Sequence, residues 1–131
     1  MIGKNNPLNV RYNPLNKWKG QTGSTKGFCD FVSQEFGIRA AAYLILRSYK
    51  RKGFKTYAQI IKRFAPPSEN QTNLYINYVC NKCNSLPFDV PSGINEYVDL
   101  LYSMSYFEGN PLSWLDIKDV IKKYFSYEDY R

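Results

Sequence analysis

Apolar residues recur every three or four positions in several stretches of this chain, and proline or glycine interrupts the pattern between them. The longest stretch begins behind Ser33 and ends before Gly53, with Ile38, Ala41, Ala42, Ile45, Leu46 and Tyr49 on one face. This spacing predicts an amphipathic α-helix that opens at Ser33, and a glycine after the last turn is a common stop. The chain is therefore expected to be mainly α-helical.

Four further helices are predicted, which makes about five in all. Three of them open on a Ser or Thr followed three positions later by a side chain that can complete a capping box, namely Thr56 with Gln59, Ser68 with Gln71, and Ser113 with Asp116. Pro66 and Pro67 must end the first of these. The fourth helix covers 94–107 and stops at Gly109.

The first 27 residues differ from the rest in composition. They are rich in Asn, Gly, Pro, Lys and Thr, and Asn-Pro occurs twice, so residues 1–27 are expected to form an irregular segment of turns and short extended pieces. The apolar residues 28–32 fit either a short strand or the approach to the first helix. Since no repeat or interdomain linker is visible, residues 1–131 are predicted to form a single domain.

Charge and hydropathy limit the partners. Eighteen Lys and Arg against eleven Asp and Glu give a net charge of +7, which attracts nucleic acid, anionic lipid or an anionic cell-wall polymer. The N-terminal sequence does not resemble a signal peptide, and no apolar run is long enough to span a membrane. We therefore expect synthesis in the cytoplasm without a signal peptide, and no transmembrane segment.

The chain has no histidine. Ser-His-Asp triads, Cys-His proteases and His-ligated zinc hydrolases are therefore excluded. Cys80 and Cys83 form a C-x-x-C pair, but Cys29 is the only other cysteine, so helix packing is favoured over a metal site. No glycine-rich phosphate loop is present, and no cofactor is predicted. Any acid-base chemistry would depend on carboxylates.

Three glutamates are candidates for that chemistry. Glu108 lies where the fourth predicted helix ends, between Phe107 and Gly109, and aromatic neighbours there would raise the pKa of its carboxyl toward that of a general acid. Glu35 stands in the first turn of the first helix, where a negative charge also suits the helix dipole. Glu69 has a similar explanation as a charge at a helix start. An exposed, purely structural glutamate remains the alternative for each.

A basic run surrounds the end of the first predicted helix, comprising Arg47, Lys50, Arg51, Lys52, Lys55, Lys62 and Arg63. A solvated face explains such a run, and cations near a helix C-terminus also complement its dipole. Interleaved Tyr49, Phe54 and Tyr57 would equally suit stacking on single-stranded nucleic acid. A nucleic-acid-binding module is therefore an alternative function.

Several motifs in order resemble small bacteriophage virion proteins described as structural or lytic. The most specific are Gly37-Ile38-Arg39-Ala40 and Ala65-Pro66-Pro67-Ser68-Glu69-Asn70, supported by 5–11, 18–21 and 28–35. A looser similarity connects 107–111 to the helix end that carries the catalytic Glu in lytic transglycosylases and cell-wall glucosaminidases. In those enzymes the catalytic helix precedes the Asn-rich segment, whereas here it follows.

The resemblance implies a lysozyme-like helical domain that cleaves the peptidoglycan glycan strand between MurNAc and GlcNAc. Glu108 would serve as general acid and base, with Glu35 and then Glu69 as the next catalytic candidates. The implied substrate-binding residues are Tyr12, Trp18 and Tyr75 as sugar-stacking walls and Asn9, Gln21 and Asn70 as hydrogen-bonding groups. The protein would be made in the host cytoplasm and be virion-associated or released to the cell wall. A non-enzymatic virion structural protein that contacts other virion proteins is the main alternative.

Overall fold

The computed structural model describes residues 1–68 and 71–131. In these residues the elements are, in chain order, β1 (Gln21–Thr25), β2 (Phe28–Phe31), α1 (Gln34–Tyr43), the π-helical η1 (Leu44–Ser48), α2 (Tyr49–Arg51), α3 (Tyr57–Phe64), α4 (Thr72–Cys83), α5 (Ile94–Phe107), α6 (Trp114–Tyr124) and α7 (Tyr127–Tyr130). The predicted mainly α fold is confirmed. No described helix is both long enough and apolar enough to cross a bilayer.

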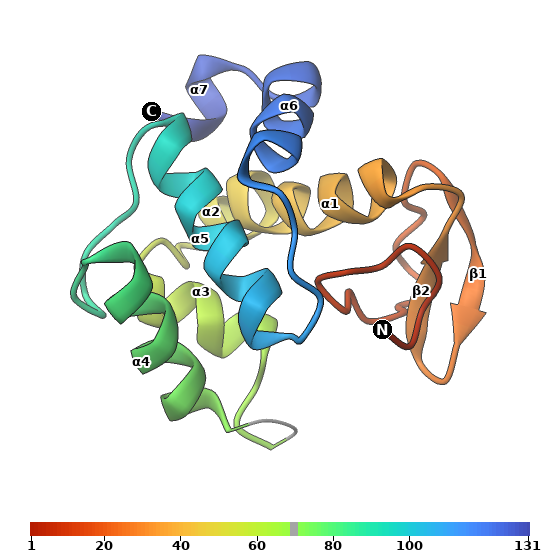
Figure 1. Ribbon diagram of the computed structural model, residues 1–131, viewed down its shortest axis with the longest axis horizontal. Helices are drawn as coiled ribbons and strands as arrows, with labels where there is room; N and C mark the ends of the chain where they lie inside the picture. The colour runs from red at the N-terminus through yellow and green to blue at the C-terminus, as the bar shows by residue number, and fades with distance from the viewer. Residues whose placement is uncertain (69–70) are drawn as a thin grey trace.

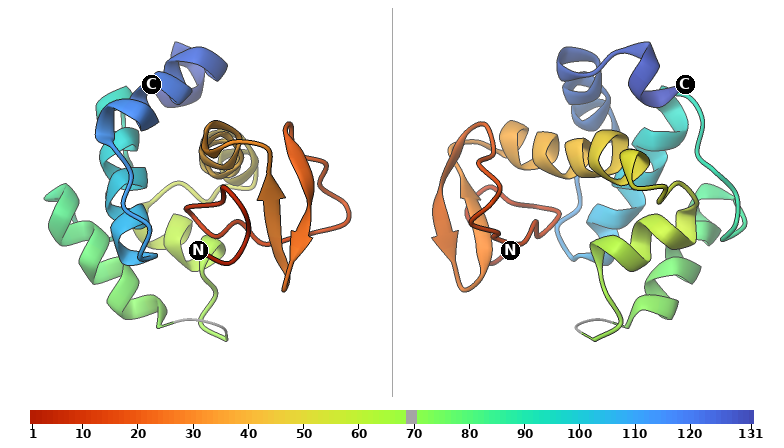
Figure 2. Two further views of the ribbon diagram at one scale, coloured as in Figure 1. Left: turned by 45° about the vertical axis from the view of Figure 1, so that its right-hand side comes forward. Right: turned by 180° about the vertical axis from the view of Figure 1, so that it is seen from behind.

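The continuous helix α1–η1–α2 runs through the middle of the molecule, as Figure 1 shows. The β1–β2 hairpin lies at one end of it, and α3 and α4 lie toward the other end (Figure 2). Helix α4 packs against α3 and α5, and α6 packs against α5 and α1. The connection between α5 and α6 passes beside the N-terminal segment (Figure 1).

The first helix matches its predicted limits. Ser33 has extended backbone angles and helix α1 begins at Gln34, although the Ser33 side chain makes no capping hydrogen bond. The helical path ends at Gly53, whose φ of +85° only glycine adopts readily. One feature was not predicted: the π-helical turn Leu44–Ser48 widens the helix in its middle.

Two of the three predicted capping patterns are confirmed. The Thr56 side chain accepts from the Gln59 N–H in a complete capping box, and Ser113 accepts from the Asp116 N–H. The prediction that Ser68 opens the third helix is wrong, because α4 begins at Thr72. The Thr72 hydroxyl donates to the carbonyl of Ala65 at 2.6 Å, and this bond ties the start of α4 to the end of α3.

The N-terminal segment is partly regular. Strand β1 lies inside the predicted irregular residues 1–27 and pairs antiparallel with β2, with a register shift between Gln21 and Gly23. Of the two alternatives for residues 28–32, the strand is confirmed. Helix α7 was not predicted, since four residues are too few to show an apolar repeat.

A buried asparagine fastens the N-terminal segment to the hairpin. The Asn6 side chain is fully buried, donates to the carbonyls of Val10 and Cys29 at 2.9 Å each, and accepts from the Val10 N–H at 2.8 Å. On the other side, the segment touches α1 at Gly37, where an added Cβ would lie 2.1 Å from the Asn5 carbonyl oxygen. These contacts fix the loop that carries Asn9 to the site described below.

Candidate active site around Glu108

Glu108 caps the C-terminus of α5. Its N–H still donates to the Met104 carbonyl at 2.9 Å, and Gly109 follows with a φ of +83°. The helix end therefore holds the Glu108 backbone in place while the chain turns away. Asn110 then donates through Nδ2 to the Pro7 carbonyl at 3.1 Å, which brings this turn against the N-terminal loop.

Two side chains from distant parts of the chain donate to the Glu108 carboxyl. Asn9 Nδ2 lies 2.8 Å from Oε1, and the Tyr75 hydroxyl lies 2.8 Å from Oε2. Tyr75 is only 1% exposed, and its ring stacks on Phe107 with centroids 4.0 Å apart. Asn9 itself has a φ of +53°, a conformation that asparagine tolerates better than most residues. The carboxyl is thus held from both sides.

Burial raises the pKa of Glu108 above its ordinary value. The hydrogen bonds from Asn9 and Tyr75 and the charge of Arg11 act in the opposite direction, because they favour the ionised form, but desolvation outweighs them. The pKa of Tyr75 is also raised, mainly by its burial and further by the negative charge of Glu108, so Tyr75 stays a neutral donor. A raised pKa increases the protonated fraction of the carboxyl at a given pH, which is what a general acid needs.

Glu108 opens into a hollow of about 210 Å³, which we call the Glu108 hollow; it is lined by Asn9, Arg11, Phe28, Phe64, Ala65 and Glu108. A second hollow of about 390 Å³ shares Asn9, Arg11 and Phe64 with it and adds Lys52 and Arg63, and we call it the basic hollow. Through Leu15 and Asn16 the basic hollow adjoins a third hollow of about 420 Å³ beside Trp18. Because neighbouring hollows share lining residues, they adjoin one another from Glu108 to Trp18, and we call this series the path.

The predicted binding residues lie along this path or behind its end. Asn9 lies at Glu108, while Tyr12, Trp18 and Gln21 together line a hollow of about 400 Å³ at the far end. Tyr75 is buried behind Glu108 rather than exposed on a wall. Glu69 and Asn70, predicted as catalytic and substrate-binding, lie outside the described residues.

Glu35 occupies a different place. Its carboxyl accepts from the Tyr124 hydroxyl and pairs with Lys123 Nζ at 3.0 Å. These hydrogen bonds, that of Tyr124 first, lower the pKa of Glu35. The carboxyl borders a separate hollow of about 260 Å³ that also contains Asp116 and Asp119. A lowered pKa favours the ionised carboxyl, so Glu35 suits the role of general acid less well than Glu108 does.

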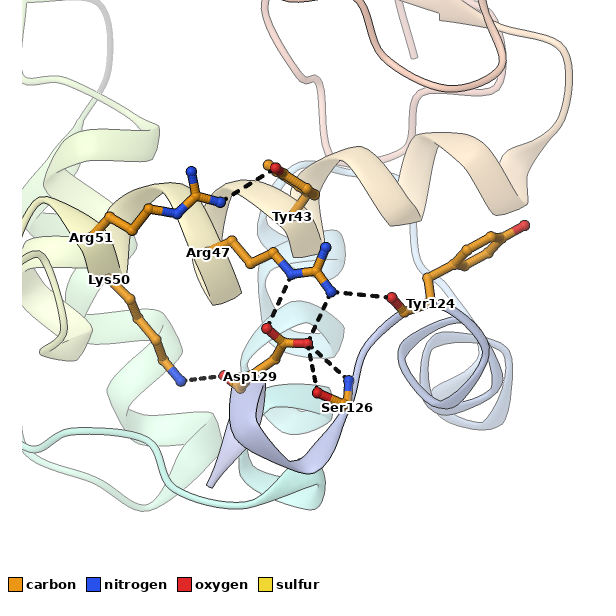
Figure 3. Close-up of polar contacts among 7 residues, drawn as sticks. All are labelled: Tyr43, Arg47, Lys50, Arg51, Tyr124, Ser126 and Asp129. Carbon is orange, nitrogen blue, oxygen red and sulfur yellow. Dashed lines mark hydrogen bonds and ion pairs between the residues drawn. The ribbon is translucent and has the colours of Figure 1, made fainter.

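Part of the predicted basic run is used inside the fold (Figure 3). The Arg47 guanidinium binds both carboxylate oxygens of Asp129 at 3.0 Å, and Lys50 donates to the Asp129 carbonyl. Arg51 donates to the Tyr43 hydroxyl at 3.3 Å. Arg47 and Lys50 therefore fasten α7 to the central helix, and the run is not one uniform face.

Sequence reasoning missed three residues of the Glu108 hollow, namely Arg11, Phe28 and Phe64. Each comes from a different segment, so no local pattern joins them. The C-x-x-C pair lies on α4, where Cys80 is buried and Cys83 contacts the Ser103 hydroxyl at 3.6 Å. Within 1–68 and 71–131, no three Cys, Asp or Glu side chains come together as metal ligands.

No family model matches the chain. It is similar to a bacteriophage protein: 124 residues are 35% identical to Protein P5 of Pseudoalteromonas phage PM2, and the match covers 89% of this chain and 76% of that protein. The chain is therefore a member of a bacteriophage protein family, as the sequence motifs predicted. The family is that of Protein P5 of phage PM2.

Proposed function

We propose that this protein is a virion-associated phage enzyme that cleaves the glycan strand of peptidoglycan between MurNAc and GlcNAc, with Glu108 as general acid and base. The observation that carries the proposal is the partly buried Glu108 carboxyl with a raised pKa, which opens into a hollow that adjoins the basic hollow and, beyond it, the hollow beside Trp18. Membership of a phage protein family supports the setting in which such an enzyme would act. The protein would reach the cell wall with the particle or after release from the host cytoplasm.

The reaction needs one carboxyl. Protonated Glu108 gives its proton to the bridging oxygen as the bond from the MurNAc anomeric carbon to that oxygen breaks. The 6-hydroxyl oxygen of the same sugar then bonds to the anomeric carbon, and its proton returns to Glu108. Among the described residues, no second Asp or Glu lines the Glu108 hollow or the basic hollow. This favours the anhydro-forming route over a two-carboxylate hydrolysis.

The neighbours of Glu108 would have distinct roles. Asn9 and Tyr75 position the carboxyl and stabilise its charge after proton transfer, because both donate to it. Tyr12, Trp18 and Gln21 would bind sugars farther along the strand, since aromatic faces and amides suit sugar rings and their N-acetyl groups.

The test is to incubate the purified protein with peptidoglycan and to weigh the released fragments by mass spectrometry. Anhydro-muropeptides are expected from the unchanged protein. Glu108→Gln keeps the shape but loses the transferable proton, so fragment release should fall at least about a hundredfold. Glu35→Gln is the matched control and should retain activity. Full activity in Glu108→Gln would move the catalytic role to Glu35 or Glu69, and intact sacculi with the unchanged protein would reject the enzyme.

A non-enzymatic virion component is the second candidate. The connection between α4 and α5 exposes three alternating apolar side chains, Leu86 (53%), Phe88 (72%) and Val90 (51%), and exposed apolar groups of this kind suit contacts with other virion proteins. If assembly is the function, Phe88→Ser should reduce the amount of protein in purified particles, whereas Glu108→Gln should not.

The nucleic-acid-binding alternative has a separate test. Binding to single-stranded DNA should weaken steeply with salt and fall when Arg51 and Lys55 are neutralised. Binding that is absent at low salt would remove this alternative.

A further inference from the structure

We infer that the basic hollow binds the carboxylates carried by muramic acid residues, either on the lactyl group or on the attached peptide, and that the protein thereby selects muramic-acid-bearing strands over neutral amino-sugar polymers. This inference rests on the proposed function, because it concerns the same path along which the glycan strand would lie. The Glu108 carboxyl alone would not distinguish a glycosidic bond in a muramic-acid-bearing strand from one in a neutral amino-sugar polymer.

The charge of the basic hollow has one sign. Arg11, Lys52 and Arg63 contribute to its lining, and none of the described lining residues is acidic. Lys52 and Arg63 form no ion pair with the described residues, in contrast to Arg47, which is bound to Asp129. An anion entering the hollow would therefore meet the charges of Lys52 and Arg63, which no described carboxylate neutralises.

The cations of the basic hollow have uncharged aromatic neighbours. Arg63 lies in the last turn of α3 with its guanidinium 5.6 Å from the Phe54 ring centre. Tyr49 also lines the hollow, and burial raises the pKa of its phenol so that it stays neutral. Lys52 stands at the end of α2. The backbone of both cations therefore belongs to the ends of helices, from which their exposed side chains reach the hollow.

The position of the basic hollow relates its charge to the bond that would be cut. It shares Asn9, Arg11 and Phe64 with the Glu108 hollow, so a group bound there lies next to a sugar at Glu108. A MurNAc residue carries its lactyl substituent, and through it the peptide, on the sugar ring itself. Charge-assisted hydrogen bonds from Lys and Arg to carboxylates are stronger than neutral ones. A chitin oligosaccharide has no carboxylate to offer.

The test measures binding to full-length Glu108→Gln, which prevents turnover. The probes are a soluble peptide-bearing GlcNAc–MurNAc fragment, the same fragment with its peptide removed to leave the lactyl carboxylate, and a neutral chitin oligosaccharide. Adding Lys52→Met and Arg63→Met should weaken binding of the charged fragments at least about tenfold and leave the neutral one unchanged. The matched control, Lys62→Met with Lys122→Met, removes the same charge from exposed positions outside the hollow and should have no effect.

Comparison of the two charged probes identifies the source of the carboxylate. Tighter binding of the peptide-free fragment assigns it to the lactyl group, whose carboxyl is an uncharged amide while the peptide is attached. Loss of binding with the peptide assigns it to the peptide, and equal binding means that the hollow accepts either carboxylate. Should the double variant not fold, Lys52→Met alone serves, since this side chain is exposed.

Two results would overturn the inference. One is equal affinity for the neutral and the charged probes. The other is single-stranded DNA that binds more tightly than the fragments and no longer binds to the Lys52 and Arg63 variant.

The inference and the proposed function fail separately. Charged fragments that bind but are never cleaved by the unchanged protein would support the inference and reject the enzyme. If the Lys52 and Arg63 variant cleaves peptidoglycan with unaltered kcat/KM, the enzyme is supported and the inference is rejected.

Discussion

Replacing Asn6 by Ala tests how the site is held in place. The substitution removes three hydrogen bonds and leaves two buried backbone groups without the partner that Asn6 supplied, the Val10 N–H and the Cys29 carbonyl. The Val10 carbonyl keeps a second partner, the Cys29 N–H at 3.0 Å. A buried polar group left unpaired costs about 1–3 kcal/mol, so the two together should lower the free energy of unfolding by about 3 kcal/mol or more.

Urea unfolding followed by far-UV circular dichroism measures this change. Asn77→Ala is the matched control, because Asn77 is exposed on α4, and its substitution should shift the free energy of unfolding by no more than about 0.5 kcal/mol. Peptidoglycan cleavage should also fall in Asn6→Ala, since Asn6 and Asn9 belong to one loop. A loss of stability below about 1 kcal/mol would refute the reasoning, because it would mean that the orphaned groups find other partners at little cost.

Further predictions concern packing and the Glu108 carboxyl. Gly37→Ala should lower stability by about 1–3 kcal/mol in thermal or urea unfolding, because the new methyl would overlap the Asn5 carbonyl; Gly23→Ala, which meets only an ordinary contact at 3.8 Å, should be tolerated. Tyr75→Phe should cost about 1.5–3 kcal/mol at neutral pH, since it removes a hydrogen bond to a charged group. It should also raise the pKa of Glu108, visible as a shift of the pH–activity profile to higher pH; an unchanged profile would contradict the assigned contact. Because the pKa of Glu108 is raised in the folded state, its contribution to stability is complete below the ordinary value of 4.5 and is lost as pH rises through the folded pKa. The stability of the unchanged protein relative to Glu108→Gln should therefore fall from pH 4.5 upward, and a rise would refute the burial argument.

Local patterns predicted the helices well. The Thr56 and Ser113 caps were found because a capping pattern depends on residues three positions apart. The same pattern failed at Ser68, where the start of α4 is set by the bond from Thr72 to Ala65, seven residues away. The capping pattern at Ser68 thus did not predict the start of α4, which depends on a contact between α4 and the end of α3.

In the candidate site, too, the local features could be predicted from the sequence and the long-range contacts could not. Glu108 could be proposed as a candidate from the sequence because the helix end and the glycine after it are visible there. Its two donors were named only as sugar-binding residues, since Asn9 is 99 positions away and Tyr75 is 33 positions away. Arg11 and Phe64 were not predicted to belong to the site. Arg11 and Phe64 come close to Glu108 only because the N-terminal loop packs against α3 and α5. Residue spacing in the sequence does not reveal such packing.

The π-helical turn makes the length of the central helix part of the site. Leu44 and Ser48 lie at the two ends of this turn, and both line the basic hollow. Winding the same five residues as ordinary α-helix would carry everything downstream about 100° farther around the axis, because the wider turn accommodates one extra residue. Tyr49 and Lys52 would then face a different side, although every contact of the helix before Leu44 would remain. Chains that share this hollow can exchange many side chains along the helix, but they must either keep the wide turn or lose the turn and its extra residue together.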